Sequence, residues 1–339
     1  MKINKWIIVF CAAFMLVSAC SKKDSDDKKE QAPNKEEKQE SAGQFPLTGI
    51  ESEQAATQRA IAVTINNHPA ARPQSGLSQA DIVYEMLAEG SVTRFLAIYQ
   101  SVKPEKVGPV RSARKYFIDL AKGYDSLYIA HGYSPDAKEK LESGTIDHIN
   151  GIQHDGTLFE RVSFRKAPHN SYITFDNIEK GAADAHYEMD EPPVPMAFLK
   201  KDEVEKLEGE RVSGMTISYS KDAGFSSEFA YDAEQEKYKR ATGGEQTVEY
   251  ETNEPVLLDN VIVIEAAHHV ADEKGRKDID LESGGKAFVL QHGIKKEAEW
   301  KNVDGRIVPY EHGRPLKLVP GKTWISIVPE MAIVSFGEK

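Results

Sequence analysis

The sequence has little cysteine, no excess of positive charge and no long apolar run. Its 339 residues include two cysteines, which excludes a disulfide-rich scaffold and the common cysteine-based zinc modules. Asp and Glu outnumber Lys and Arg by 54 to 43, giving a formal net charge of −11. A protein that coats nucleic acid needs the opposite balance, so we expect no nucleic-acid partner. The length predicts about two domains.

The longest apolar stretch lies at the N-terminus. Residues 6–16 follow two lysines, and they are too few to cross ~30 Å of hydrocarbon as a helix but fit the core of a signal peptide. Residues 17–20 read VSAC, which resembles a bacterial lipobox. We predict a lipoprotein signal peptide over residues 1–19, acyl chains such as palmitate on Cys20, and a lipid anchor at the extracytoplasmic face of the cell membrane. An ordinary secretory signal is the alternative.

Residues 20–44 are predicted to be a disordered tether behind that anchor. Between positions 21 and 44 there are six lysines, seven acidic residues and only two alanines to represent the hydrophobic residues. Such a segment cannot bury enough apolar surface to offset the entropy of ordering it. Its balanced charge also argues against a polybasic lipid-binding role.

The predicted globular part begins at residue 45, and its first half, residues 45–195, has the alternating pattern of an α/β layered domain. The short, β-branched segment at residues 60–65 predicts a strand, and residues 92–100 and 126–130 are also strand-like. Helices are predicted at residues 79–89, capped by Ser78, at 112–122, and from Pro135 to about 141.

Three prolines within residues 192–195 mark a break in the chain. A helix is predicted at 198–207, and the remainder of 196–339 is predicted to be a mostly antiparallel β-rich domain. Its expected strands are residues 212–219, 228–231, 246–250, 261–265, 287–290, 324–328 and 332–336.

The familiar catalytic motifs are incomplete. Residues 321–323 read GKT but lack the earlier glycine of a phosphate-binding loop, and a strand is expected after them. Residues 131–135 read HGYSP, like the start of a nucleophile elbow, yet Pro135 has no N–H to offer an oxyanion hole. The ten histidines show no HExxH or comparable spacing. We therefore predict no metal and no cofactor.

The densest polar region lies between residues 72 and 114. Asp81, Glu85 and Glu89 would share one face of the predicted helix. Arginines at positions 94, 111 and 114 are placed to compensate them. This carboxylate–guanidinium group is either a ligand site or a structural set of Arg fork pairs, and the structural interpretation is favoured because nothing in the pattern specifies a reaction.

Four stretches resemble the signature of the YerB family of lipoproteins from Bacillus and related Firmicutes. They are residues 71–85 (ARPQSGLSQADIVYE), 89–94 (EGSVTR), 108–114 (GPVRSAR) and 168–170 (PHN). Weaker similarity continues at residues 260–263, at Trp300 and at residues 320–325. The resemblance implies a pair of domains of unknown function on a lipid anchor. The ligand-binding candidates that it carries over are Arg72, Asp81, Tyr84, Glu85, Glu89, Arg94, Arg111, Arg114, His169 and Asn170.

Three functional hypotheses follow. The preferred one is a membrane-anchored lipoprotein that binds a protein partner or a cell-envelope ligand and performs no chemistry. The alternative is an envelope hydrolase that uses one carboxylate among Asp81, Glu85 and Glu89, with Arg111 or Arg114 holding the substrate. A purely structural spacer is the third.

Overall fold

The computed structural model describes residues 43–53 and 56–338. The predicted signal peptide, Cys20 and all but the last two residues of the predicted tether lie outside these ranges. Within the described part, no helix is both long and apolar enough to cross a membrane.

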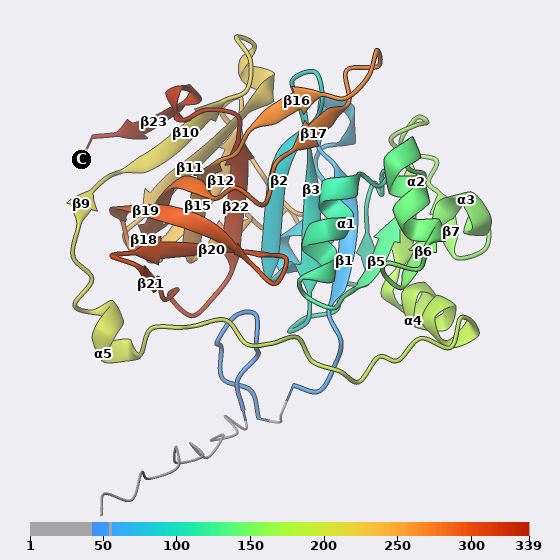
Figure 1. The fold of residues 1–339 in the computed structure, drawn as a ribbon, viewed down its shortest axis with the longest axis horizontal. Helices are drawn as coiled ribbons and strands as arrows, with labels where there is room; N and C mark the ends of the chain where they lie inside the picture. The colour runs from blue at the N-terminus through green and yellow to red at the C-terminus, as the bar shows by residue number, and fades with distance from the viewer. Residues whose placement is uncertain (1–42, 54–55, 339) are drawn as a thin grey trace, which may run out of the picture. The chain divides into compact units, whose positions relative to one another are not determined.

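A 12-stranded mixed sheet organises the described chain (Figure 1). Its order is β21-β20-β19-β18-β15-β22-β2-β3-β1-β5-β6, with β9 paired to β19. The strands are β1 (Ile61–Asn66), β2 (Ile82–Glu89), β3 (Val92–Tyr99), β5 (Leu127–Ala130), β6 (His148–Asn150), β9 (Glu210–Arg211), β15 (Asn260–Glu265), β18 (Gly285–Gln291), β19 (Ile294–Val303), β20 (Arg306–Glu311), β21 (Arg314–Pro315) and β22 (Thr323–Val328).

Two groups of parallel strands lie within this sheet. β1, β5 and β6 run parallel, so their carboxyl ends meet at one edge. β2, β22 and β15 also run parallel, while β1 pairs antiparallel with β3. Alternate residues of β2 enter two different cores, with Tyr84 and Met86 in one and Val83 in the other.

Few helices accompany the sheet. They are α1 (Lys115–Lys122), α2 (Pro135–Glu142), α3 (Gly151–His154), α4 (Phe175–Asp184) and α5 (Lys201–Val204). Figure 1 shows α1 to α4, in green, gathered around β5 and β6. α1 packs Phe117 and Leu120 into the core that holds Tyr84, whereas α4 packs Ile178 into the core that holds Val83.

Smaller sheets complete the fold. A six-stranded antiparallel sheet joins β13 (Glu245–Gln246), β12 (Lys237–Thr242), β11 (Ser226–Asp232), β10 (Gly214–Ser218) and β23 (Val334–Gly337), with β14 (Leu257–Leu258) on β12. β4 (Lys106–Val107), β8 (Ser171–Thr174) and β7 (Phe159–Arg161) form a third sheet, and β16 (His268–Val270) pairs with β17 (Lys277–Ile279). Met215, Ile217 and Phe229 of the six-stranded sheet enter the core that holds Val83.

The predicted helix at residues 79–89 is wrong, because this segment forms the central strand β2. β2 is covered on both faces and flanked by β22 and β3, so both of its faces carry apolar residues and the sequence does not alternate. The apolar residues at positions 82, 83, 86 and 87 also match helical spacing, which misled the prediction. Gly90, with a φ of 56°, turns the chain between β2 and β3 and does not end a helix.

Other boundaries also differ from the predictions. α1 begins at Lys115, three residues later than expected, so Arg111 and Arg114 both precede the helix. The helix predicted at residues 198–207 is reduced to Lys201–Val204, and of residues 246–250 only Gln246 belongs to a strand. The strand predictions at residues 60–65, 92–100 and 126–130 are confirmed within one or two residues.

The mixed α and β content agrees with the predicted α/β class. The C-terminal half is less antiparallel than expected, because β15 and β22 pair in parallel. Moreover, β22 pairs with β2, so strands from both sides of the predicted boundary at residue 195 belong to one sheet.

Candidate functional site

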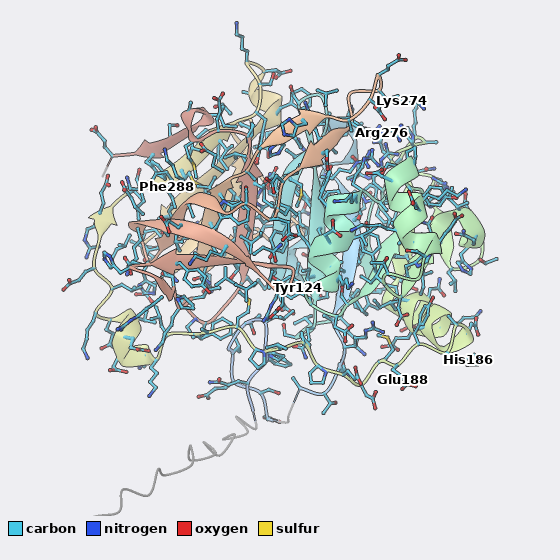
Figure 2. All side chains as sticks on the ribbon, in the orientation of Figure 1. Tyr124, His186, Glu188, Lys274, Arg276 and Phe288 are labelled. Atoms are coloured by element: carbon cyan, nitrogen blue, oxygen red, sulfur yellow. The ribbon has the colours of Figure 1, made fainter. Side chains whose placement is uncertain are left out.

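Two of the predicted site residues are core residues. The Asp81 carboxylate is fully buried and accepts hydrogen bonds from the backbone N–H groups of Gln100 (2.6 Å) and Ser101 (2.8 Å), and from the Ser101 hydroxyl. Burial raises the pKa of Asp81, and these hydrogen bonds oppose the rise. The Tyr84 hydroxyl lies 2.7 Å from that of Tyr124, which Figure 2 labels at the end of α1. The Asp81 and Tyr84 side chains therefore form their hydrogen bonds inside the core.

The Glu85 carboxylate is fully buried and accepts hydrogen bonds from five different residues. They are Asn67 Nδ2 (3.3 Å), Thr93 Oγ1 (2.9 Å), Ser227 Oγ (2.8 and 2.9 Å), Arg240 Nη2 (3.1 Å to both oxygens) and Trp324 Nε1 (3.1 Å). Side-chain exposure is 0% for Glu85 and 1% for Arg240, so the ion pair is removed from solvent. Such a pair is tolerated in the interior only when its remaining hydrogen-bonding capacity is satisfied.

Arg240 is a central residue that the sequence analysis missed. Its guanidinium lies 4.6 Å from the ring centroid of Trp324 and 5.2 Å from that of Phe95. Its Nη1 donates to the hydroxyls of Thr242 (3.0 Å) and Thr247 (2.7 Å). In the structure alternate residues of β12 are buried, which points Arg240 inward, but the strand's sequence KYKRAT does not alternate apolar and polar residues and gave no signal for this.

The remaining motif residues form a second group, the strand-end cluster, which consists of Glu89, Arg94, Arg111 and Arg114. Arg94 Nη2 donates to both Glu89 oxygens at 3.1 Å, and Arg114 Nη2 donates to Glu89 Oε1. Side-chain exposure is 38% for Glu89 but only 3% for Arg94 and 4% for Arg114. The carboxylate therefore reaches solvent while its two arginine partners do not.

Three guanidinium groups in this cluster act on one carboxylate. Burial opposes ionisation of Glu89, but Arg94, Arg114 and Arg111 outweigh it and lower the pKa of Glu89. Burial, followed by the charge of Arg114, lowers the pKa of Arg94 to about 9. Burial also lowers the pKa of Arg111. The Nη1 atom of Arg111 donates a hydrogen bond to the carbonyl of Pro168 at 3.3 Å. The Nε atoms of Arg111 and Arg114 are buried without a hydrogen-bond partner among the described residues.

The cluster lies where the parallel strands end. Arg94 is the register partner of Asn66, the last residue of β1, and the Arg111 N–H donates to the carbonyl of Thr64 at 2.9 Å. The Arg111 carbonyl accepts from the N–H of His131, the residue after β5, at 3.0 Å. The carboxyl edge of parallel strands is where α/β proteins commonly bind ligands.

Histidines border the cluster. His68 and His169 stack with ring centroids 4.6 Å apart, and Asn66 Nδ2 lies 2.8 Å from His169 Nδ1. Burial lowers the pKa of both histidines; for His169 the charges of His68 and Arg111 add to this. The Asn170 side chain accepts a hydrogen bond from Arg161 at 3.3 Å.

His131 and Ser171 do not form a catalytic pair. Arg161 Nη2 donates to His131 Nε2 at 2.9 Å, so that ring nitrogen carries a lone pair. The proton is then on Nδ1, which donates to the Ser171 hydroxyl at 2.7 Å. A base that activates serine must accept the hydroxyl proton, which is the opposite arrangement.

Arg72 lies apart from the strand-end cluster. Its Nε donates to the carbonyl (3.2 Å) and side-chain oxygen (3.0 Å) of Asn67, its Nη2 to the Asn67 carbonyl (2.8 Å) and its Nη1 to the Gly224 carbonyl (2.9 Å). It lines a pocket of about 270 Å³ together with Arg240. Burial, followed by the charge of Arg240, lowers the pKa of Arg72 to about 10.

The ten predicted residues therefore separate into three places. Asp81 and Tyr84 are in the core, Glu85 and Arg72 lie near Arg240, and the rest gather at or beside the strand-end cluster. Of the three carboxylates named for the hydrolase alternative, Asp81 and Glu85 are fully buried with their own hydrogen-bond partners, and Glu89 reaches solvent.

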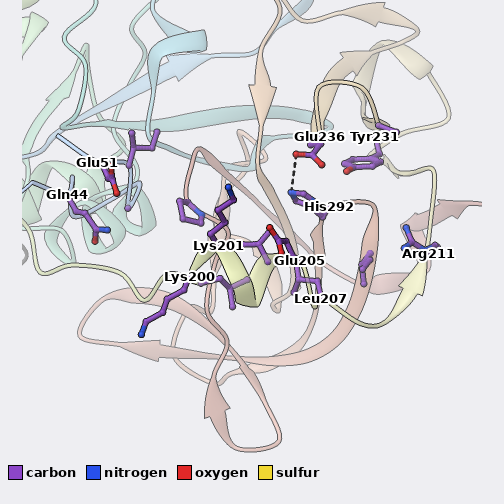
Figure 3. A pocket seen from close by; sticks show the side chains of 17 residues that line it. Gln44, Glu51, Lys200, Lys201, Glu205, Leu207, Arg211, Tyr231, Glu236 and His292 are labelled. Atoms are coloured by element: carbon purple, nitrogen blue, oxygen red, sulfur yellow. Dashed lines mark ion pairs between the residues drawn. The ribbon is translucent and has the colours of Figure 1, made fainter. Parts of the chain in front are cut away.

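A larger cavity lies elsewhere. It has a volume of about 1050 Å³ and is lined by residues of the α5 region, the start of the described chain and the β18–β19 turn, as Figure 3 shows. His292 and Glu236 form an ion pair of 3.9 Å there. None of the ten predicted residues lines it. Among the described residues, no group of three or more His, Cys, Asp or Glu side chains is arranged to hold a metal ion.

Comparison with known proteins gives the class of this chain. Residues 47–188 match the N-terminal domain, and residues 215–325 the C-terminal domain, of a family described as a protein of unknown function (DUF3048). The chain belongs to this two-part family.

A particular relative is YerB of Bacillus subtilis (strain 168), which is named as a candidate lipoprotein. The two are 47% identical over 99% of each chain. The crystal structure of the Bacillus subtilis YerB protein superposes with a TM-score of 0.81 at 48% identity, covering 87% of this chain and 99% of that one. The resemblance noted in the sequence is thereby confirmed.

Proposed function

We propose that this chain is a lipid-anchored protein of the extracytoplasmic membrane face that binds an anionic cell-envelope ligand through the strand-end cluster. Support for the anchor comes from the lipobox-like residues 17–20 and from the relative named as a candidate lipoprotein. Support for ligand binding comes from one observation, the excess of guanidinium over carboxylate groups at the carboxyl edge of parallel strands.

The net positive charge of the strand-end cluster indicates which class of ligand it would bind. Three guanidinium groups and one carboxylate leave an excess of two positive charges, and two guanidinium Nε–H groups have no partner within the described chain. Arginine matches the oxygens of phosphate and carboxylate groups with paired hydrogen bonds. A ligand carrying such groups would supply counter-charge and accept hydrogen bonds from Arg111, which is the partly exposed guanidinium of the three.

Binding can be tested with the full-length protein in detergent and purified cell envelopes. We expect Arg111→Gln to weaken co-sedimentation about tenfold, the loss expected for a hydrogen bond to a charged group. Arg314→Gln, which changes an exposed arginine in β21, is the matched control. Added salt should weaken wild-type binding, and inorganic phosphate should compete. Equal binding by Arg111→Gln and wild type would contradict the proposal.

The anchor is tested separately. Cys20→Ala should move the protein out of the membrane fraction, because Cys20 is the proposed attachment point of the acyl chains. A variant that stays fully membrane-bound would show that another element holds the protein there.

A further inference from the structure

The pocket beside Arg72 and Arg240 has the features of a second binding site. It has a volume of about 270 Å³ and is lined by residues 67–74 from the N-terminal family segment and residues 240–248 from the C-terminal one. None of the four residues of the strand-end cluster lines it. The pocket and the strand-end cluster therefore share no residue.

Arg72 has unused hydrogen-bonding capacity in this pocket. A guanidinium carries five N–H groups. The hydrogen bonds to Asn67 and Gly224 occupy one N–H on each nitrogen, which leaves one on Nη1 and one on Nη2. Across the described chain, no carboxylate lies within ion-pair distance of Arg72. Its charge is thus held in place but not neutralised.

Two hydroxyl groups add further donors. Thr242 Oγ1 and Thr247 Oγ1 both accept hydrogen bonds from Arg240 Nη1. Since their oxygens already accept, their protons are free to donate, and within the described residues neither hydroxyl has an acceptor. The pocket therefore presents donors to any molecule inside it, and its ligand should carry hydrogen-bond acceptors.

The local charges favour a single negative charge on that ligand. Arg240 is paired with Glu85 in the interior, so the two together are nearly neutral. Arg72 supplies a positive charge with no carboxylate in direct contact, and the exposed Glu245 at the rim, whose charge also acts on Arg72, limits the negative charge that the pocket would accept. A carboxylate fits this balance better than a doubly charged phosphate group.

The pocket walls define the rest of the ligand. Pro69, Pro73 and Val248 contribute apolar surface next to the donors, and the volume lies just below the range of common small-molecule sites. We propose that this pocket, the Arg72 pocket, binds a carboxylate attached to a short apolar group, as at the C-terminus of a peptide. Arg72, Thr242 and Thr247 hold the carboxylate, and the prolines and Val248 contact the apolar part.

The test compares two probes that differ only in their terminal group, a charged carboxylate in one and a neutral amide in the other. N-acetyl-dialanine with a free carboxylate and the same compound as its C-terminal amide are titrated into the full-length protein in detergent by ligand-observed NMR. We expect the acid to bind at least about tenfold more tightly than the amide. Propionate should bind weakly through the same residues, and inorganic phosphate should bind more weakly than the acid.

Variants separate the pocket from a general effect of charge. Arg72→Gln should abolish binding of the acid. Arg72 also holds Asn67 and Gly224 in place, so a second variant is needed. Thr247→Val replaces only a hydroxyl by a methyl group and should weaken binding of the acid about tenfold. Thr247→Ser keeps the hydroxyl and should bind the acid as wild type does. Arg314→Gln should bind as wild type.

Several results would overturn the proposal. These are equal affinity for acid and amide, no binding of the acid at ~10 mM (a ΔG° of only about −2.7 kcal/mol), wild-type binding by folded Thr247→Val, or tighter binding of inorganic phosphate. Arg111→Gln should not change binding of the acid. The failure of this proposal is therefore distinguishable from failure of the proposed function.

Discussion

Glu85 and Glu89 lie four residues apart on the same strand and both bind arginine, yet their surroundings differ. Glu85 is fully buried, has five donors and pairs with an arginine 155 positions later in the chain. Glu89 reaches solvent and is surrounded by arginines from nearby positions. A register shift between Leu87 and Glu89 interrupts the regular alternation of β2 between them.

This comparison shows how one type of residue pair can occupy two electrostatic settings. Around Glu85, one guanidinium balances one carboxylate and five residues donate hydrogen bonds to it, which fixes the structure. Around Glu89, positive charge is in excess, which would favour an anion. The difference can be tested by changing each pair in turn.

The largest effect is expected at the buried pair. Arg240→Met should lower the free energy of unfolding by about 3–5 kcal/mol, because it leaves the Glu85 carboxylate buried without its counter-charge. Denaturant unfolding of the full-length protein measures this. The double variant with Glu85→Gln should recover much of the loss, since the uncompensated charge is then removed. A change below about 1 kcal/mol for the single variant would mean that the pair is not isolated from solvent.

A smaller effect is expected at the exposed carboxylate. Glu89→Gln should cost about 1 kcal/mol at neutral pH, because Glu89 is partly solvated. Since the pKa of Glu89 is lowered on folding, its contribution is present above its unfolded-state pKa of 4.5 and is lost as the pH falls through the lower folded-state value. The variant should lack this part of the acid dependence, which denaturant titrations at several pH values would detect. An unchanged acid profile would contradict the prediction.

The smallest effect concerns the histidines beside the strand-end cluster. Burial lowers the pKa of His68 and of His169 from the ordinary value of 6.5. The unfolded chain therefore takes up protons first, and stability should fall as the pH drops through about 6.5. His169→Gln should reduce this decline, measured as the shift in Tm between about pH 7.5 and about pH 5.5. A steeper decline in the variant would show that the sign is wrong.

Local patterns in the sequence predicted the elements that depend on nearby residues. Residues 60–65 form a short β-branched segment, residues 126–130 a short apolar one, and Pro135 lies in the first turn of α2; these predictions are confirmed. β2 could not be recognised in the same way, because its burial on both faces depends on β22, which lies more than 230 residues later in the chain.

The candidate site was likewise predictable only where its residues lie close together in the sequence. Arg94, Arg111 and Arg114 come from motifs close in the sequence, and the structure does bring them to Glu89. The partners of Glu85 were not predictable, because Ser227 and Arg240 approach it only through the stacking of two sheets, which no local spacing encodes. The helix that was expected to align the three acids does not exist, and Asp81 lies in the core, apart from the strand-end cluster.

The position of β22 has a consequence for how the chain is made. β22 (Thr323–Val328) pairs with β2 on one side and β15 on the other, and it is encoded almost at the end of the sequence. A chain synthesised or exported from its N-terminus therefore presents β2 long before the partner for its open edge exists. The central sheet closes only when synthesis is nearly complete, so a truncated product that ends before residue 323 lacks β22. The edges of β2 and β15 that β22 would pair with then stay open, and we expect proteases to degrade such a product.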